Sequence, residues 1–153
     1  MEEQHEWTRE AIAASCDEAA DLLEGKWTRG VWYEEQDIIE IRDVGEPYTR
    51  STQVRMCAEG ALAAALGLDA SQIQGNDTLR SELRDCAVYN AVHVTIAEKM
   101  NALDPEDQDG WADSIASWND DYAVDEAEVL DVLRTTAKLM RGVGPDQMEV
   151  HHA

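Results

Sequence analysis

The stretch MCAEGALAAALG, residues 56–67, decides the expected fold. It consists mostly of Ala, Gly and Leu, and Gly67 is a natural helix stop. We predict a helix from about Thr52 to Leu66. Small side chains let neighbouring backbones approach closely, so this helix should lie at the centre of the fold. A glycine inside a helix lowers helix stability by about 1 kcal/mol relative to Ala. We therefore expect that close packing against another part of the chain requires Gly60.

Three further segments have apolar residues at helical spacing, each preceded by polar residues that favour a helix start. The starting residues are Thr8, Asn76 or Asp77, and Asp125 with Glu128 as a capping-box-like pair. The predicted helices run to about Leu23, Leu103 and Met140. The inward face predicted for the longest one is Leu79, Leu83, Cys86, Ala87, Asn90, Val94, Ala97 and Met100.

Aromatic and β-branched residues gather between Trp27 and Ile41. Both a short β-hairpin and an irregular loop anchored by aromatic side chains fit this composition. Residues 43–52 contain glycine and proline and are predicted to be a loop. The expected fold is therefore mainly α, with about four helices around the small-residue helix and a short hairpin near 27–41. We predict one globular domain over 1–141 and a flexible C-terminal tail over 142–153.

The chain carries 33 acidic and 12 basic residues, a formal net charge of −21. Affinity for nucleic acid comes from Lys and Arg on phosphates, so direct nucleic-acid binding is not expected. Anionic membranes are excluded as partners for the same reason, and no stretch approaches the roughly 18 apolar residues of a membrane span. A basic protein is the natural complement, although solubility or adaptation to high salt would also explain the charge. A homo-oligomer remains compatible with the sequence.

The cysteines Cys16, Cys57 and Cys86 are odd in number and lie in apolar, helix-like contexts, which indicates a reducing compartment. The N-terminus has neither a basic region nor an apolar run, so we predict a cytoplasmic protein. No phosphate-binding glycine loop, nucleophile elbow or dinucleotide fingerprint is present, and we expect no cofactor. No HExxH motif and no Cys/His cluster with ligand spacing supports a metal site.

One enzymatic hypothesis rests on Cys57 near a helix start, where the helix dipole would lower the pKa of a thiol. His93 and Asn119 could complete a Cys-His-Asn arrangement in space. The alternative is that Cys57 is a small buried core residue and His93 a structural histidine within a helix. We favour the second interpretation and assign no catalytic residue.

The segment DPEDQDGWAD, residues 104–113, invites a calcium interpretation. An EF-hand loop needs ligands where Pro105 and Ala116 stand, so a solvated acidic loop is the better interpretation. Between Met100 and Leu133 there are eleven acidic residues and no basic residue. This stretch is either a solvated face or a docking surface for a basic protein. The predicted partner-binding residues are Asp107, Asp109, Trp111, Asp113, Asp121 and Tyr122.

Two short motifs carry a resemblance: CAEGAL at residues 57–62, and Ile115-x-x-Trp-Asn-Asp120. They resemble a family of uncharacterised small acidic proteins from actinobacteria and their phages. The resemblance implies a mostly helical domain and supplies no activity, substrate or catalytic residue. Trp118 is expected to anchor a loop in the core, with Asn119 and Asp120 bonding to backbone groups; the alternative is a recognition motif.

The predicted function is that of a non-enzymatic interaction protein that binds and modulates a basic or nucleic-acid-associated host protein. If the chain is phage-encoded, the compartment is the host cytoplasm. The alternatives are a small cysteine-dependent enzyme using Cys57 and a structural or assembly component.

Overall fold

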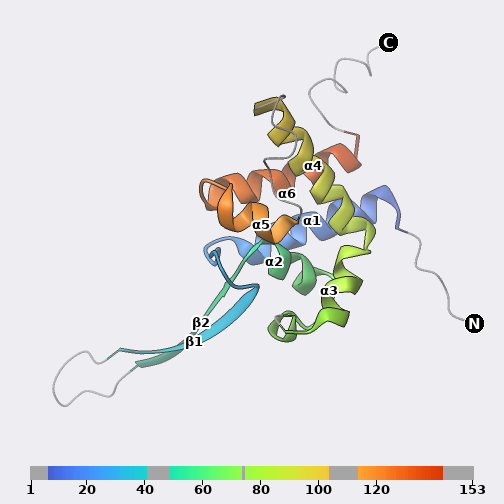
Figure 1. The fold of residues 1–153 in the computed structure, drawn as a ribbon. Coiled ribbons are helices and arrows are strands. Elements are labelled where there is room, and N and C mark those ends of the chain that lie inside the picture. Colours follow the sequence, from blue (N-terminus) through green and yellow to red (C-terminus); the bar gives the residue numbers. More distant parts are fainter. Residues whose placement is uncertain (1–6, 41–48, 74, 104–113, 143–153) are drawn as a thin grey trace, which may run out of the picture.

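The computed structural model describes residues 7–40, 49–73, 75–103 and 114–142, and Figure 1 shows a helical body from which one hairpin projects. The chain is mainly helical, as predicted, with six α-helices and one two-stranded sheet in the described part. In chain order the elements are α1 (Arg9–Leu23), β1 (Tyr33–Glu40), β2 (Thr49–Met56), α2 (Ala58–Ala65), the short 3₁₀ helix η1 (Ala70–Gln72), α3 (Asp77–Arg84), α4 (Ala87–Leu103), α5 (Ile115–Asp121) and α6 (Glu126–Met140). The division into one domain and a tail stays a prediction, and residues 143–153 lie outside the described part.

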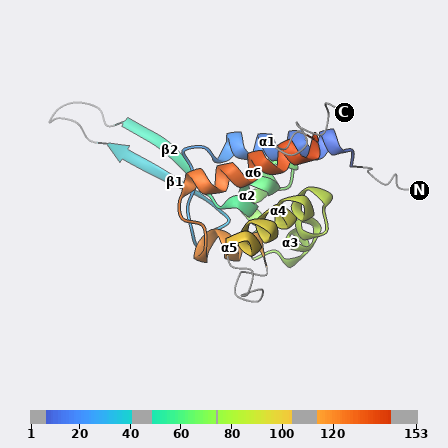
Figure 2. The ribbon, with the colours of Figure 1, turned by 90° about the horizontal axis from the view of Figure 1, so that it is seen from above.

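Helix α2 lies among the other helices, as its small side chains predicted (Figure 2). Its residues from Ala58 to Ala63 are buried, and it packs against α1, α5 and η1. Close packing explains the glycine at position 60, as expected, because a Cβ atom there would lie 1.7 Å from the carbonyl oxygen of Trp32. The chain leading into β1 therefore passes directly over the first turn of α2.

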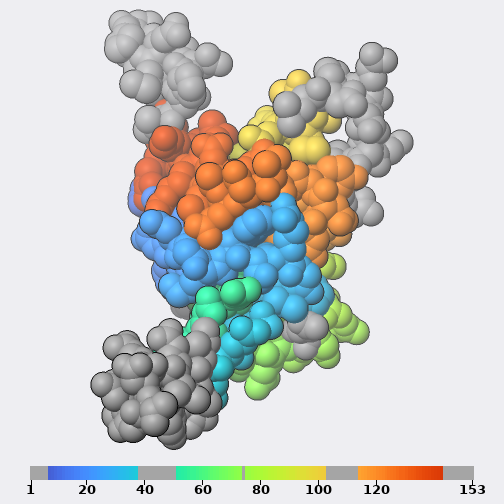
Figure 3. Space-filling model, turned by 90° about the vertical axis from the view of Figure 1, so that its left-hand side faces the viewer, coloured from blue at the N-terminus to red at the C-terminus, as the bar shows by residue number. Residues whose placement is uncertain are grey.

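Helices α1 and α6 lie side by side and run antiparallel (Figure 2), and their surfaces adjoin in Figure 3. Both helices begin at the polar capping residues that the sequence predicted as their starts. Thr8 Oγ1 accepts a hydrogen bond from the Ala11 N–H at 3.0 Å, and Asp125 Oδ1 accepts one from the Glu128 N–H at 2.9 Å. These caps satisfy backbone donors that the helix itself leaves unpaired.

Ion pairs also join α1 to α6. The Arg134 guanidinium donates to Asp17 at 3.1 Å and to Asp21 at 2.6 Å. Arg141 donates to Asp17 at 2.7 Å and to Glu10 at 2.9 Å. The Arg141 guanidinium binds both oxygens of Glu10, a bidentate geometry that adds specificity as well as energy.

The hairpin is present, and its first strand lies within residues 27–41, but its second strand does not. β1 pairs with β2 in antiparallel register, with Tyr33 opposite Met56. The prediction that a helix begins near Thr52 is wrong, because the chain stays extended through Met56. Thr52 and Val54 are β-branched and occupy alternate positions, which favours a strand once a partner strand is available.

The predicted helix over residues 77–103 is two helices, α3 and α4. Asn76 caps the first one as predicted, since its Oδ1 accepts a hydrogen bond from the Leu79 N–H at 3.1 Å. The break at residues 85–86 turns α4 relative to the predicted face. Residues with buried side chains on α4 are Val88, Tyr89, Val92, Thr95 and Ile96. Asn90 and Val94, predicted inward, are exposed, Val94 by 55 %.

Candidate functional site

A buried polar cluster surrounds the first turn of α2. Glu59 is completely buried, and its carboxylate accepts hydrogen bonds from Trp32 Nε1 at 3.2 Å, the Tyr89 hydroxyl at 3.0 Å and the Ala116 N–H at 2.7 Å. The Arg84 guanidinium lies 3.7 Å from the same carboxylate. A buried charge is tolerated when donors and an opposite charge surround it, and a helix N-terminus favours a negative charge. Glu59 therefore joins α2 to the chain before β1, to α3, to α4 and to α5.

Asn119 on α5 forms the second part of this cluster. Its Oδ1 accepts hydrogen bonds from Trp27 Nε1 at 2.7 Å and from the Ala58 N–H at 3.0 Å, and its Nδ2 donates to the Thr28 carbonyl at 3.1 Å. Trp118 is 1 % exposed. The structural interpretation of the Trp-Asn-Asp motif is confirmed, although these residues lie on a short helix and not in a loop.

The two motifs that carry the sequence resemblance meet here. Glu59 from residues 57–62 bonds to Ala116, and Asn119 from residues 115–120 bonds to Ala58. Asp120 also accepts a hydrogen bond from the Gly30 N–H at 2.9 Å. Both motifs thus serve one structural network. In the sequence, the signal for this network was a single acidic residue, Glu59, within a run of small apolar residues.

The residues of the catalytic hypothesis occupy structural positions. Cys57 is the N-cap of α2 and is buried, as expected, and burial raises the pKa of its thiol to about 12. A thiol with such a pKa supplies little thiolate near neutral pH, so it is a poor nucleophile. His93 is half-buried on α4, where its ring stacks on that of Tyr89 with centroids 6.1 Å apart. The amide of Asn119 holds Trp27, Thr28 and Ala58, as described above.

Within the described residues, no three His, Cys, Asp or Glu side chains are arranged to hold a metal ion. The segment 104–113, which prompted the calcium interpretation, lies outside the described part. No helix in the described ranges is long and apolar enough to cross a membrane.

Two of the predicted partner-binding residues, Asp121 and Tyr122, fall in the described part, where α5 ends. Both side chains are exposed, Tyr122 by 40 %, and the neighbouring Val124 is 74 % exposed. An exposed aromatic and an exposed aliphatic residue thus lie beside acidic residues. The remaining predicted residues lie outside the described part; they are Asp107, Asp109, Trp111 and Asp113.

The basic side chains are used differently from the acidic ones. Seven of them hold carboxylates, carbonyl groups or aromatic rings of the fold: Arg9, Arg29, Arg80, Arg84, Lys99, Arg134 and Arg141. Several exposed acids have no ion pair with another described residue: Glu18, Glu24, Glu82, Asp85, Glu98, Asp121 and Asp131. Exposed Lys26, Arg55 and Lys138 likewise have no ion pair with a described residue. Most of the described positive charges therefore stabilise the molecule internally, while an excess of negative charge faces the solvent.

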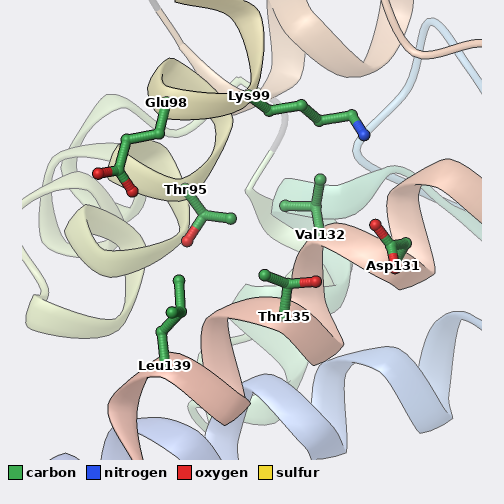
Figure 4. A pocket seen from close by; sticks show the side chains of 7 residues that line it. All are labelled: Thr95, Glu98, Lys99, Asp131, Val132, Thr135 and Leu139. Carbon is green, nitrogen blue, oxygen red and sulfur yellow. The ribbon is translucent and has the colours of Figure 1, made fainter. Parts of the chain in front are cut away.

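A hollow of about 270 Å³ lies between α4 and α6, whose side chains face each other across it in Figure 4. Its lining residues are Thr95, Glu98 and Lys99 from α4, and Asp131, Val132, Thr135 and Leu139 from α6. A second hollow of about 610 Å³ shares Thr95, Glu98 and Leu139 with the first and extends to Ile12 on α1. Together they form one surface depression, which we call the α4–α6 groove.

Comparison with known proteins supplies a family and no activity. A family model described as a family of unknown function (DUF6197) matches residues 7–139. No curated protein and no solved structure matches the chain. The matched range includes the whole Glu59 and Asn119 network.

Proposed function

Since this chain belongs to a family of unknown function (DUF6197), we propose from its own surface that it is a non-enzymatic protein that binds and modulates a basic protein. The observation that carries the proposal is the unequal use of charge. Arg134 and Arg141 are held between helices, whereas Glu98, Asp121 and Asp131 are exposed without an ion pair to a described residue. Complementary potentials steer diffusional encounter and disfavour partners of the wrong charge.

The docking surface in this proposal is the acidic stretch between Asp107 and Tyr122. Charge at a rim raises the association rate more than the affinity, so an interface also needs buried apolar anchors. Exposed Tyr122 and Val124 support such a role beside Asp121. Trp111 would be a second anchor.

The biological setting is part of the proposal. The CAEGAL and Trp-Asn-Asp segments resemble proteins of actinobacteria and their phages, which supports a host protein as the partner. All three cysteines are free thiols, which supports a reducing cytoplasm. A basic host protein that holds nucleic acid fits the charge, because an acidic surface would compete with phosphates for the same Lys and Arg side chains.

The alternatives have less support. The high pKa and burial of the Cys57 thiol disfavour a cysteine-dependent enzyme. Self-assembly into a structural component would bring together copies that each carry a net charge of −21. Like charges across an interface are costly.

The test is affinity capture from an actinobacterial lysate at low and at moderate salt. One variant replaces Asp107, Asp109, Asp113 and Asp121 with Asn. The matched control removes four exposed charges from α1 and the region of α3, as Glu18→Gln, Glu24→Gln, Glu82→Gln and Asp85→Asn.

The wild type and the control should capture the same basic proteins at low salt, and the acidic-stretch variant should lose them. Capture should weaken as salt rises, since exposed charges are screened beyond about 10 Å at 0.1 M salt. Equal capture by all three proteins at every salt concentration would contradict the proposal. Equal loss of capture in the variant and the control would show that only the total charge matters, and it would also contradict a specific docking surface.

A further inference from the structure

We propose that the α4–α6 groove takes up an amphipathic helix from the basic partner. The apolar face of that helix would lie in the groove, with its Lys or Arg side chains against Glu98 and Asp131. This inference rests on the proposed function, and it assigns the partner element and a second contact surface for the same partner, in addition to the acidic stretch.

The apolar part of the groove supports a helix as the occupant. On α4, Ala87, Ala91 and Val94 follow one another at spacings of four and three residues, so they lie on one face of the helix. The Val94 side chain is 55 % exposed, which leaves its apolar surface available to a partner. On the opposite side, Ile12 and Leu139 line the same hollow. A groove between helices with an apolar lining is the surface that amphipathic helices recognise, through anchors at positions i, i+3, i+4 and i+7.

The charged part of the groove selects the sign of the partner. Glu98 and Asp131 line the hollow between α4 and α6, are exposed, and have no ion pair with a described residue. The cations beside them are engaged. Lys99 lies 3.5 Å from Glu128, and Arg9 donates to the last carbonyl groups of α6 at 2.8 Å. Two carboxylates thus face the solvent at an apolar groove without a counter-charge, which a cationic helix would supply.

Charge also separates this occupant from a second copy of the chain. Another copy would add a net charge of −21 beside carboxylates that are already unpaired. A basic helix reduces that repulsion as it buries apolar surface. The electrostatic and the hydrophobic contributions then both favour binding. Because part of the binding is electrostatic, it should weaken as salt rises.

The probe is a fluorescent synthetic peptide of about 18 residues built from Leu and Lys, with Leu at positions i, i+3, i+4 and i+7. A scrambled peptide of the same composition lacks the apolar face, and a peptide with Glu in place of Lys has the opposite charge. Binding to the full chain is measured by fluorescence anisotropy across a series of salt concentrations. Analytical ultracentrifugation of the chain alone reports self-association.

Paired substitutions separate the groove from the rest of the surface. Val94→Glu places a charge in the groove, and Ala14→Glu places the same charge at an exposed position of α1 that lies outside it. The double variant Glu98→Gln with Asp131→Asn removes both rim charges. Its control, Glu18→Gln with Asp85→Asn, removes one Glu and one Asp elsewhere on the exposed surface. All of these side chains are exposed, and circular dichroism checks that each variant is folded.

The amphipathic basic peptide should bind the wild type, and Val94→Glu should weaken it by about tenfold, as loss of an apolar anchor does. The rim variant should weaken binding at low salt and flatten its salt dependence, with both controls unchanged. Equal binding to Val94→Glu and wild type would overturn the groove assignment. In that case capture of basic proteins that depends on Asp121 would leave the proposed function standing.

Equal binding of the scrambled peptide would also overturn the inference, since it would show attraction by charge alone. Failure of the wild type to bind the peptide, together with a dimer that Val94→Glu dissociates, would assign the groove to a second copy instead. Failure of peptide binding and of all basic-protein capture would remove the proposed function itself.

Discussion

Replacement of the buried carboxylate of Glu59 should destabilise the fold more than any exposed charge substitution. In Glu59→Gln one carboxylate oxygen becomes an NH₂ group. All three hydrogen-bonding partners of Glu59, namely Trp32 Nε1, the Tyr89 hydroxyl and the Ala116 N–H, are donors in this structure. The amide oxygen of Gln can therefore accept hydrogen bonds on only one side of the side chain, and the NH₂ group must face a donor on the other side.

The magnitude follows from those contacts. A hydrogen bond to a charged group contributes about 1.5–3 kcal/mol, and an unsatisfied buried polar group costs about 1–3 kcal/mol. The Gln side chain keeps its oxygen toward Tyr89 and Ala116 and loses the bond to Trp32, so we expect a loss of about 2 kcal/mol. Glu59→Ala removes all three acceptor contacts and should cost about 3–5 kcal/mol, as does breaking a buried pair by removing one partner.

The assay is urea unfolding followed by tryptophan fluorescence, with thermal unfolding as a second measure. A loss of about 4 kcal/mol in a domain of this size lowers Tm by roughly 8–16 °C. The matched control is Glu82→Gln, the same chemical change at an exposed position on α3, with an expected effect of about 0.5 kcal/mol or less. A loss of less than about 1 kcal/mol in the free energy of unfolding of both Glu59 variants would refute the reasoning, because buried donors that lose their acceptor are left unsatisfied.

Three further predictions follow from particular contacts. Gly60→Ala, normally a stabilising helix substitution, should destabilise by about 1–3 kcal/mol in urea unfolding because the new Cβ would meet the Trp32 carbonyl; a gain in stability would contradict this packing. The Arg141 guanidinium lowers the pKa of the Glu10 carboxyl below its ordinary 4.5, so this ion pair stabilises the fold above that pH and less as the pH falls. Arg141→Met should therefore destabilise at pH 7 and less at about pH 3, and an equal loss at both would count against the pairing. Cys57 should react with a thiol reagent only slowly at neutral pH in the folded protein, and rapid labelling would revive the cysteine-enzyme hypothesis.

The sequence predicted those elements whose signals are local. Helices α1 and α6 begin at Thr8 and Asp125 because a polar side chain caps each first turn, and that rule needs only a few neighbouring residues. Gly60 could be identified as a packing position without its partner being known. The strand β2 could not be found in the same way, since residues 49–56 become a strand through pairing with β1.

The face of α4 was missed for a different reason. The predicted apolar pattern continued in phase from Leu83 through to Val94, and neither Gly nor Pro marks the break at residues 85–86. The break shifts the helical phase, which buries Tyr89 and exposes Val94. The same shift brings Tyr89 to Glu59 and gives the α4–α6 groove its exposed apolar residue.

The acidic stretch was recognised from its composition, but the engagement of the basic side chains was not. A list of charges does not show that Arg134 and Arg141 lie between α1 and α6, because their partners are more than one hundred residues away in the chain. Glu98 and Asp131 lie on different helices, and only the packing of α4 against α6 places them beside one groove.

The most direct measurement of the central claim is the association rate constant between the full chain and a captured basic partner, determined by stopped-flow fluorescence over a series of salt concentrations. For the wild type the rate constant should be well above the 10⁵–10⁶ M⁻¹s⁻¹ of unsteered pairs at low salt and should fall steeply as salt rises. The variant with Asn at Asp107, Asp109, Asp113 and Asp121 should have a shallower salt dependence, and the control with four charges removed from α1 and the region of α3 should match the wild type more closely. Identical salt dependence in the wild type and the acidic-stretch variant would contradict the claim that this surface receives the partner.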